Sequence, residues 1–399
     1  MYLWGVRAMR TMAGRLAAAI LGTAVLVTAC SSGSDDDSAD KVSKSKPTTT
    51  TADAPAGSVY PGAEWATADA ASLGFDPAKL DEIAAAAEKD KSFCLVVTRH
   101  GKIAAEWNWA GNTPTRAHEV FSATKSYSST LVGIAQAEGK LDIGDKASKY
   151  IPEWAGTPSA DVTVKDLISN DSGRHWDFRT DYQGLIGAAD RTAFGVGLEQ
   201  DAPPGTMWAY NNSAIQTLDA VLQQATGVEP ADYAKAKVFD PIGMAHSHMT
   251  LDNAGNTNTF FGLQSTCQDM ARFGYLFLRK GNWDGEQLVP EAWVDEATGK
   301  PSQELNAGYG YLWWLNRFGP QPGPAAATDP NAGPAKDGQA VPDAPNDMFW
   351  AIGLGNQIIS VDPGSDTVAV RIGPTTANGT SGFGTREIAK VVTEALVTR

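Results

Sequence analysis

Hydrophobic residues along the chain recur with two different periods, which predict where its helices and strands lie. Apolar residues at helical spacing behind an Asp-Pro pair predict a helix over residues 76–88. Residues 93–99 and 102–109 read as two strands that form a hairpin around His100 and Gly101. The chain therefore begins its folded part with a helix followed by a hairpin.

The middle of the chain, from about residue 140 to 300, reads mainly as helices and loops, and a last helix is expected from Thr385 to about Val397. Strands at both ends around a helical middle indicate an α/β fold of the α+β type. We expect an antiparallel sheet flanked by helices, together with a mainly helical subdomain. The later strands are expected at Gly308–Asn316, Met348–Ile352, Gln357–Val361 and Thr367–Ile372.

Residues 318–346 interrupt this pattern with an insertion rich in Pro, Gly and Ala. A long loop inside a folded domain is usually either functional or disordered. The insertion ends just before the strand expected at Met348–Ile352, so it could overhang a site there and select substrates. A surface insertion without a function explains the same composition.

The first residues have the pattern of a secretion signal rather than of a folded element. Arginines precede an apolar stretch within residues 1–29, and Val-Thr-Ala-Cys follows, with Cys30 as the last residue. This end resembles a bacterial lipobox, in which the cysteine is lipid-modified, although a plain signal with an incidental cysteine is the alternative. Residues 30–58 are polar and read as a flexible tether. We therefore expect a folded domain over residues 59–399, exported and lipid-anchored on the outer face of the cytoplasmic membrane.

A Ser-Ala-Thr-Lys stretch at residues 122–125 is the first candidate for chemistry. It precedes apolar residues at helical spacing that Gly139 ends, so Ser122 and Lys125 should share one face in the first turn of a helix. A hydroxyl and an amine held in this way can act as nucleophile and base. The alternative is a helix-capping serine beside a solvated lysine. A second match, at residues 43–46, lies in the polar tether and is discarded.

Two further elements lie later in the chain. Tyr210 and Asn212 form a Tyr-x-Asn triplet that precedes a helical pattern, where a capping asparagine beside a packed tyrosine is the ordinary interpretation. A phenol close to a lysine could instead pass protons. Gly353, Leu354 and Gly355 interrupt two strand patterns, as happens where a ligand approaches the backbone closely. An ordinary turn between strands is the alternative.

These three elements, in this order, resemble the serine β-lactamase and penicillin-binding superfamily. The closer resemblance is to its class C-like branch, which includes D-alanyl-D-alanine carboxypeptidases, family VIII carboxylesterases and 6-aminohexanoate-dimer hydrolases. The resemblance implies a β-lactamase/transpeptidase-like fold and a serine hydrolase. It implies that Ser122 is the acyl-accepting nucleophile, that Lys125 and Tyr210 act as general base and proton shuttle, and that Asn212 holds the substrate or the Lys–Tyr geometry. Backbone N–H groups of Ser122 and of the strand near Leu354 would form the oxyanion hole.

The third element departs from the superfamily pattern. Many members carry Lys-Thr-Gly or His-Thr-Gly where this chain has Gly353, Leu354 and Gly355, without a cation. Because that cation helps to hold a substrate carboxylate, its absence favours ester or amide substrates. A D-Ala-D-Ala carboxypeptidase or weak β-lactamase is the alternative enzyme. A tethered binding or sensing protein without turnover is the alternative of another class.

Composition limits the partners. With 32 Lys and Arg against 46 Asp and Glu, the net charge of −14 argues against binding to nucleic acid and against direct adhesion to anionic lipid. We expect a small-molecule or peptide-like acyl substrate, and contact with the membrane only through Cys30. Neither a metal nor a cofactor is expected, because the histidines lack ligand spacing and no phosphate-binding glycine loop occurs. Cys94 and Cys267 either form a disulfide, as exported proteins allow, or remain two buried thiols.

Overall fold

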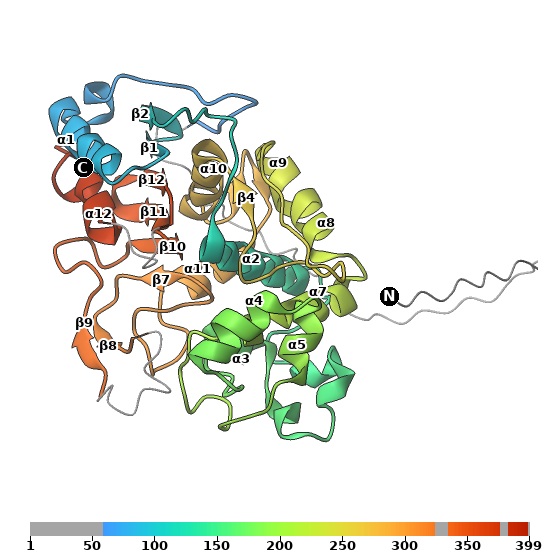
Figure 1. The fold of residues 1–399 in the computed structure, drawn as a ribbon. Coiled ribbons are helices and arrows are strands. Elements are labelled where there is room, and N and C mark those ends of the chain that lie inside the picture. Colours follow the sequence, from blue (N-terminus) through green and yellow to red (C-terminus); the bar gives the residue numbers. More distant parts are fainter. Residues whose placement is uncertain (1–58, 324–333, 376–381, 398–399) are drawn as a thin grey trace, which may run out of the picture. The chain divides into compact units, whose positions relative to one another are not determined.

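A six-stranded antiparallel sheet organises the computed structural model, which describes residues 59–323, 334–375 and 382–397 (Figure 1). Its strand order is β2-β1-β12-β11-β10-β7. The first and last thirds of the chain thus share one sheet, as the sequence predicted, in an antiparallel sheet with helices. The strands are β1 (Cys94–Arg99), β2 (Lys102–Asn108), β7 (Trp314–Leu315), β10 (Phe349–Gly353), β11 (Gln357–Asp362) and β12 (Thr367–Ile372).

Helices cover both faces of this sheet because successive side chains of its strands point to opposite sides. On β1, Leu95 and Val97 face the core under α1 (Pro77–Lys89) and α12 (Thr385–Thr393). Cys94 and Val96 face the second and larger core, which contains α2 (Thr124–Ala137) and α10 (Cys267–Leu278). Strands that are apolar on both faces are the sequence signature of such a sheet.

The second part of the fold is mainly helical, as predicted, and holds most of the residues between about 140 and 300. Its helices are α3 (Val164–Ser169), α4 (Leu185–Gly187), α5 (Arg191–Gly197), α6 (Asn212–Gln216), α7 (Leu218–Thr226), α8 (Pro230–Ala234), α9 (Asp240–Ile242) and α11 (Glu291–Thr298). Short 3₁₀ turns are η1 (Ala71–Leu73), η2 (Phe121–Ala123), η3 (Ala147–Lys149), η4 (Pro152–Trp154), η5 (Pro158–Asp161) and η8 (Pro363–Ser365), and π turns are η6 (Thr180–Gly184) and η7 (Lys235–Phe239).

Three two-stranded sheets complete the described elements: β3 (His118–Glu119) with β4 (Gln264–Ser265), β5 (Asn282–Trp283) with β6 (Glu286–Gln287), and β8 (Gly319–Gln321) with β9 (Lys336–Gly338). The last pair lies in the predicted structureless insertion. Its far end is anchored, since the Asn316 amide donates to the backbone oxygens of Val341, Ala344 and Pro345.

Several predicted features lie outside the described residues, namely the signal at 1–29, Cys30, the rest of the tether to residue 58, and positions 324–333 of the insertion. Among the described helices, none combines the length and apolar character that crossing a membrane requires.

Helix α2 is the central helix of the fold, and every residue from Thr124 to Ala135 is buried. Two of its buried serines find backbone partners: Ser126 donates to the Leu312 oxygen at 2.8 Å, and Ser128 to the Thr259 oxygen at 2.7 Å. Buried polar groups remain stable only with such partners. The helix that carries Lys125 is thus fixed by contacts on several sides.

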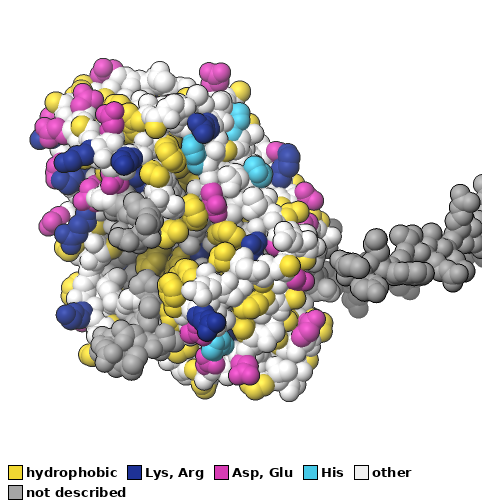
Figure 2. Space-filling model, in the orientation of Figure 1, with side chains coloured by type: hydrophobic (Ala, Val, Ile, Leu, Met, Phe, Trp, Pro, Cys, Tyr) yellow, Lys and Arg dark blue, Asp and Glu magenta, His cyan; other side chains and the backbone are white. Residues whose placement is uncertain are grey.

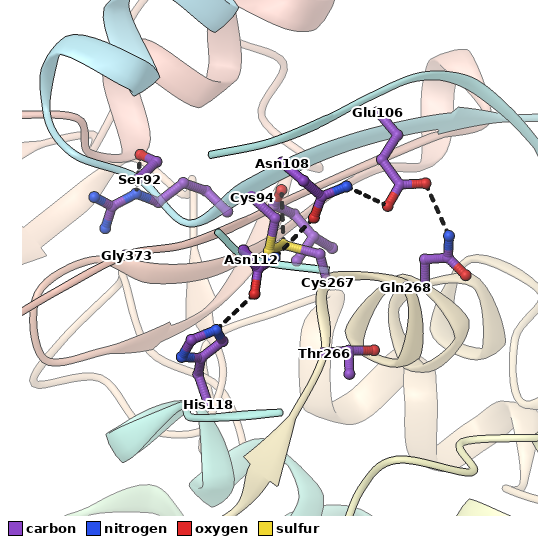
Figure 3. The surroundings of a disulfide bond; sticks show 12 residues. Ser92, Cys94, Glu106, Asn108, Asn112, His118, Thr266, Cys267, Gln268 and Gly373 are labelled. Carbon is purple, nitrogen blue, oxygen red and sulfur yellow. Dashed lines mark hydrogen bonds between the residues drawn. A yellow bond between two sulfur atoms is a disulfide. The ribbon is translucent and has the colours of Figure 1, made fainter. Parts of the chain in front are cut away.

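A disulfide joins Cys94 on β1 to Cys267 at the start of α10 (Figure 3). The structure thus contains the first of the two alternatives for these cysteines. Next to it, the Phe93 and His118 rings stack at 4.5 Å, and the His118 Nε2 lies 2.7 Å from the Asn112 amide oxygen. The bond ties the sheet to the helix that covers it, 173 residues further along the chain.

Candidate active site

Ser122 lies in the short 3₁₀ turn η2 that leads into α2, one turn earlier than predicted, since α2 itself begins at Thr124. The preceding residue, Phe121, has φ +48°, a left-handed conformation that is uncommon for an aromatic residue. Backbone strain of this kind is often kept where function requires it. The turn leaves Ser122 partly exposed, whereas Lys125 behind it is buried.

Lys125 reaches Ser122 from the first turn of α2. Its Nζ donates to the Ser122 Oγ at 2.8 Å and to the backbone oxygen of Phe260 at 2.9 Å. Removal from water disfavours the charged amine, so burial lowers the pKa of Lys125 to about 7, against an opposing effect of the Asp181 charge. A substantial fraction of this lysine is therefore uncharged near neutral pH and can accept a proton.

Tyr210 forms the other side of this group. The Lys125 Nζ lies 4.7 Å from the centre of its ring, which stacks on Trp314 at 5.6 Å. Its phenol also hydrogen-bonds to the Ser122 side chain. Burial raises the pKa of Tyr210 well above its usual value, so the phenol stays protonated near neutral pH. The structure thus brings a hydroxyl, an amine and a phenol together from separate parts of the sequence.

Asn212 is held by the carboxylate of Asp181. Its amide donates to the Asp181 Oδ2 at 2.7 Å, and its backbone N–H donates to the same oxygen at 3.0 Å. The residue that caps helix α6 is its neighbour Asn211, whose side chain accepts from the Ala214 N–H at 2.8 Å. Asn212 therefore fixes the loop that carries Tyr210 through a carboxylate.

The third element lies directly against the serine turn. Gly353 ends β10, and a Cβ atom at this position would lie 2.0 Å from the Val120 oxygen and 3.3 Å from the Ala123 nitrogen. No side chain fits there, which explains the glycine. Leu354 follows with about half of its surface exposed, and Gly355 has φ +76° in the turn to β11.

A buried arginine supports this turn from below. Arg371 on β12 is fully buried, and its Nη1 donates to the backbone oxygens of Gly355 and Asn356. Its Nε donates to the Ser92 Oγ at 2.8 Å, and its Nη2 pairs with the Asp90 carboxylate at 3.3 Å. The cation beneath Gly355 thus has a structural role.

Residues 170–181 hold the Tyr210 loop in place. Asn170 accepts the Ala209 N–H with its backbone oxygen and the Asn211 N–H with its side chain. The Trp176 indole donates to the backbone oxygen of Tyr210 at 2.9 Å. These residues carry no recognisable sequence pattern, because their partners lie about 35 to 40 positions away. The local signal is Asn170, since asparagine is one of the residue types that end helices in a left-handed conformation.

Residues 178–186, at the end of this segment and just beyond it, expose three large hydrophobic side chains, Phe178, Tyr182 and Ile186. Phe178 and Tyr182 stack at 4.9 Å, and the Asn212 amide hydrogen-bonds to the Tyr182 phenol. Figure 2 shows hydrophobic side chains gathered across the middle of this face, over the region where β10 meets the start of α2 in Figure 1. This face of the molecule therefore carries an apolar area.

A large pocket of about 940 Å³ lies elsewhere, among η4, η5, α5 and α7, and Ser122 does not line it. We place the site at Ser122 nevertheless, because the reactive groups are there. Within the described residues, no three His, Cys, Asp or Glu side chains form a group that could hold a metal ion.

Comparison with known proteins identifies the family and the fold of this chain. The family model named Beta-lactamase matches residues 81–390. The 6-aminohexanoate-dimer hydrolase of Paenarthrobacter ureafaciens is 23% identical over 252 residues, which cover 58% of this chain and 64% of that enzyme. The match thus leaves more than a third of the enzyme's length uncovered.

Solved structures show the same fold at low identity. A Bacillus anthracis protein named as a 6-aminohexanoate-dimer hydrolase superposes with a TM-score of 0.64 and 20% identity, over 84% of this chain and 85% of that one. The D-alanine carboxypeptidase of Burkholderia cenocepacia gives a TM-score of 0.54 and 20% identity, over 78% and 97%. Since the family model spans most of the sequence, the chain belongs to the beta-lactamase family, whose relatives include hydrolases of the serine type.

Proposed function

We propose that this protein is an exported serine hydrolase that cleaves ester or amide bonds through an acyl-enzyme on Ser122. The observation that carries the proposal is the contact between the Ser122 hydroxyl and the buried Lys125 amine, 2.8 Å apart, with the Tyr210 ring next to both. A nucleophile beside a desolvated amine is the arrangement that activates a serine.

The chemistry follows from the protonation states. Uncharged Lys125 takes the proton of the Ser122 hydroxyl as the oxygen attacks the substrate carbonyl carbon. Tyr210, a protonated phenol, donates its proton to the departing alcohol or amine and is reprotonated from Lys125. Water then attacks the acyl-enzyme by the reverse route, which releases the acid. Between the two candidates for the acylation base, this assignment favours Lys125, because burial lowers its pKa and raises that of Tyr210.

Backbone donors would stabilise the negative oxygen of the intermediate. The Ser122 N–H and the N–H near Leu354 belong to two segments in direct contact, since Gly353 touches Val120. Two such donors typically contribute about 3–4 kcal/mol each to the lowering of the barrier.

The substrate we propose lacks a carboxylate at the third element. Gly353 stands where the cation of the Lys-Thr-Gly pattern would be, and the neighbouring Arg371 is buried beneath the turn and engaged with backbone oxygens. Exposed hydrophobic side chains at Phe178 and Tyr182 suit an apolar acyl or leaving group. A cell-wall carboxypeptidase is the second candidate, favoured by the fold shared with the Burkholderia cenocepacia enzyme. A binding protein without turnover is the third.

One mass measurement tests the proposal. The purified domain is exposed to a serine-directed fluorophosphonate, and we expect one adduct on Ser122, absent in Ser122→Ala and slow to form in Lys125→Ala. No adduct on the wild-type protein would favour a binding role. Hydrolysis of short and long acyl esters, measured beside a chromogenic cephalosporin, separates the two enzymes, because a carboxypeptidase or β-lactamase would react preferentially with the cephalosporin.

We also propose that the protein is anchored by lipid on Cys30 after removal of residues 1–29, with residues 30–58 as a tether. The charge and apolar pattern of the leader and the cysteine that ends it support this. The mass of the mature N-terminal peptide tests it, since Cys30→Ser should abolish a diacylglyceryl modification. An unmodified mature Cys30 would contradict the anchor.

A further inference from the structure

We propose that Asp181 is a positioning residue of the reaction, which holds Tyr210 and Asn212 beside Ser122 and places a negative charge behind the catalytic lysine. This inference rests on the proposed function, because it concerns how the same groups are kept ready to react. This aspartate lies in a stretch that carries no recognisable sequence motif.

The first argument is burial together with hydrogen bonding. Asp181 lies in the π turn η6 and is fully buried. Its Oδ2 accepts from the Asn212 N–H at 3.0 Å, the Asn212 amide at 2.7 Å and the Trp176 indole at 3.2 Å. Its Oδ1 accepts from the Ser213 N–H at 2.7 Å and the Ser213 hydroxyl at 2.8 Å. Five donors on one carboxylate leave it little freedom to move.

The donors identify what the carboxylate holds. Four of the five come from Asn212 and Ser213, the two residues that follow Tyr210 and Asn211 at the start of α6. The fifth donor, the Trp176 indole, also donates to the backbone oxygen of Tyr210 at 2.9 Å. Asp181 is therefore the common partner of the loop that carries the phenol.

The second argument is electrostatic. Groups that face this cluster are Lys125 from α2, Tyr210 from the loop before α6, Tyr182 from η6, and Tyr309, whose ring meets that of Tyr210 at 6.1 Å. Among the described residues, Asp181 is the charged group that acts on Lys125, and it opposes the effect of burial. Burial raises the pKa of Asp181, and the hydrogen bonds from Asn212 and Ser213 and the charge of Lys125 oppose that rise. Loss of the carboxylate charge should therefore lower the pKa of Lys125 further.

The test compares Asp181→Asn with Asp269→Asn in the full exported domain. Asp269 is a matched control, since it is also buried and accepts from a backbone N–H (His246, 2.9 Å) and a serine hydroxyl (Ser247, 2.8 Å) away from Ser122. The measured quantity is the rate constant of fluorophosphonate labelling of Ser122 from pH 5 to 9. In Asp181→Asn the new NH₂ group faces donors, so the Tyr210 loop should shift.

We expect Asp181→Asn to slow labelling at least tenfold at pH 8 and to move the midpoint of the acidic limb to lower pH. Asp269→Asn should keep both the rate and the midpoint while its melting temperature falls. A purely structural Asp181 would slow labelling without moving the midpoint, which would overturn the electrostatic part. Wild-type rate and midpoint in Asp181→Asn would overturn the whole inference while leaving the proposed function intact. An unlabelled wild-type protein would instead overturn the proposed function and this inference with it.

A second pair of variants, with smaller changes, tests the inference if Asp181→Asn does not fold. Ser213→Ala removes one donor to Asp181, and Ser247→Ala removes the equivalent donor to Asp269. We expect a threefold to tenfold slower labelling in Ser213→Ala and an unchanged rate in Ser247→Ala. Equal rates in the two variants would overturn the positioning role.

Discussion

Gly353 and Val120 touch so closely that a Cβ atom on residue 353 would lie 2.0 Å from the Val120 backbone oxygen. The contact joins the end of β10 to the turn that presents Ser122, two segments more than 200 residues apart. Whatever displaces one of them displaces the other, so the distance between the proposed oxyanion donors depends on this contact.

Gly353→Ala should therefore reduce activity strongly. The added methyl group must push the strand and the serine turn apart, and overpacking of this kind costs about 1–3 kcal/mol. We expect labelling of Ser122 to fall at least a hundredfold, while the far-ultraviolet circular dichroism spectrum is retained. Gly197→Ala is the control, since a Cβ there meets no atom within 4 Å. Near-normal labelling in Gly353→Ala would show that the close contact is unimportant.

The labelling rate of Ser122 should depend on pH through Lys125. Because burial lowers the pKa of this amine to about 7, it is protonated and unable to act as a base below that pH. We expect the rate constant to rise about tenfold per pH unit below pH 7 and to level off above it. A flat profile from pH 5 to 9, measured with a reagent that does not titrate, would exclude Lys125 as the base.

Lys125 should also make stability depend on pH. Its pKa is 10.5 in the reference state and about 7 when folded, so the unfolded chain binds one more proton between these values. Stability from this residue is thus fully present above pH 10.5 and is lost as pH falls to 7. Relative to Lys125→Met, the wild-type protein should gain about 2 kcal/mol of unfolding free energy between pH 7 and 9. Urea titrations at both pH values measure this, and a constant difference would refute it.

Tyr210→Phe should remove proton transfer while retaining the packing of the ring against Trp314. We expect ester hydrolysis to fall about 100-fold to 1,000-fold, within the range typical of general acid–base catalysis. Tyr127→Phe is a matched control on α2, because the Tyr127 phenol is buried without a hydrogen-bond partner among the described residues. Comparable losses in both variants would assign the effect of Tyr210 to packing.

The Cys94–Cys267 disulfide should stabilise the protein without taking part in turnover. It closes a loop of more than 170 residues, and loss of a native disulfide typically costs about 2–5 kcal/mol. We expect no free thiols among these two residues in denatured, unreduced protein. The double Cys94→Ala/Cys267→Ala variant should unfold at lower urea with unchanged labelling at 20 °C. Slower labelling in that folded variant would point to a role closer to the reaction.

Local sequence signals predicted those parts of the fold that short-range physics determines. The helix behind Asp76 formed because that side chain accepts the Ala78 N–H at 2.9 Å, and the first hairpin formed around His100 and Gly101, both at positive φ. The strand expected at Gly308–Asn316 was too long, since only Trp314 and Leu315 pair with β10. An apolar run alone does not distinguish a strand from a buried irregular segment.

The groups that we propose to react could be selected from the sequence, but the contacts that hold them could not. Ser122, Lys125 and Tyr210 stand in short motifs whose spacing carries the chemistry. Asp181 and the Phe260 oxygen act only through contacts that folding creates, across 31 and 135 positions respectively. The β8–β9 pair was missed because glycine and proline in that stretch obscure any alternation.

Arg371 gives the two sides of the reacting serine different freedom to vary. A guanidinium buried beneath Gly355 and Asn356 holds that turn through hydrogen bonds to both backbone oxygens. By contrast, Phe178, Tyr182 and Ile186 lie at the surface. Substitutions that change the substrate preference during evolution would therefore accumulate at these exposed positions. A replacement there alters which substrates bind and leaves the proposed reacting groups in place.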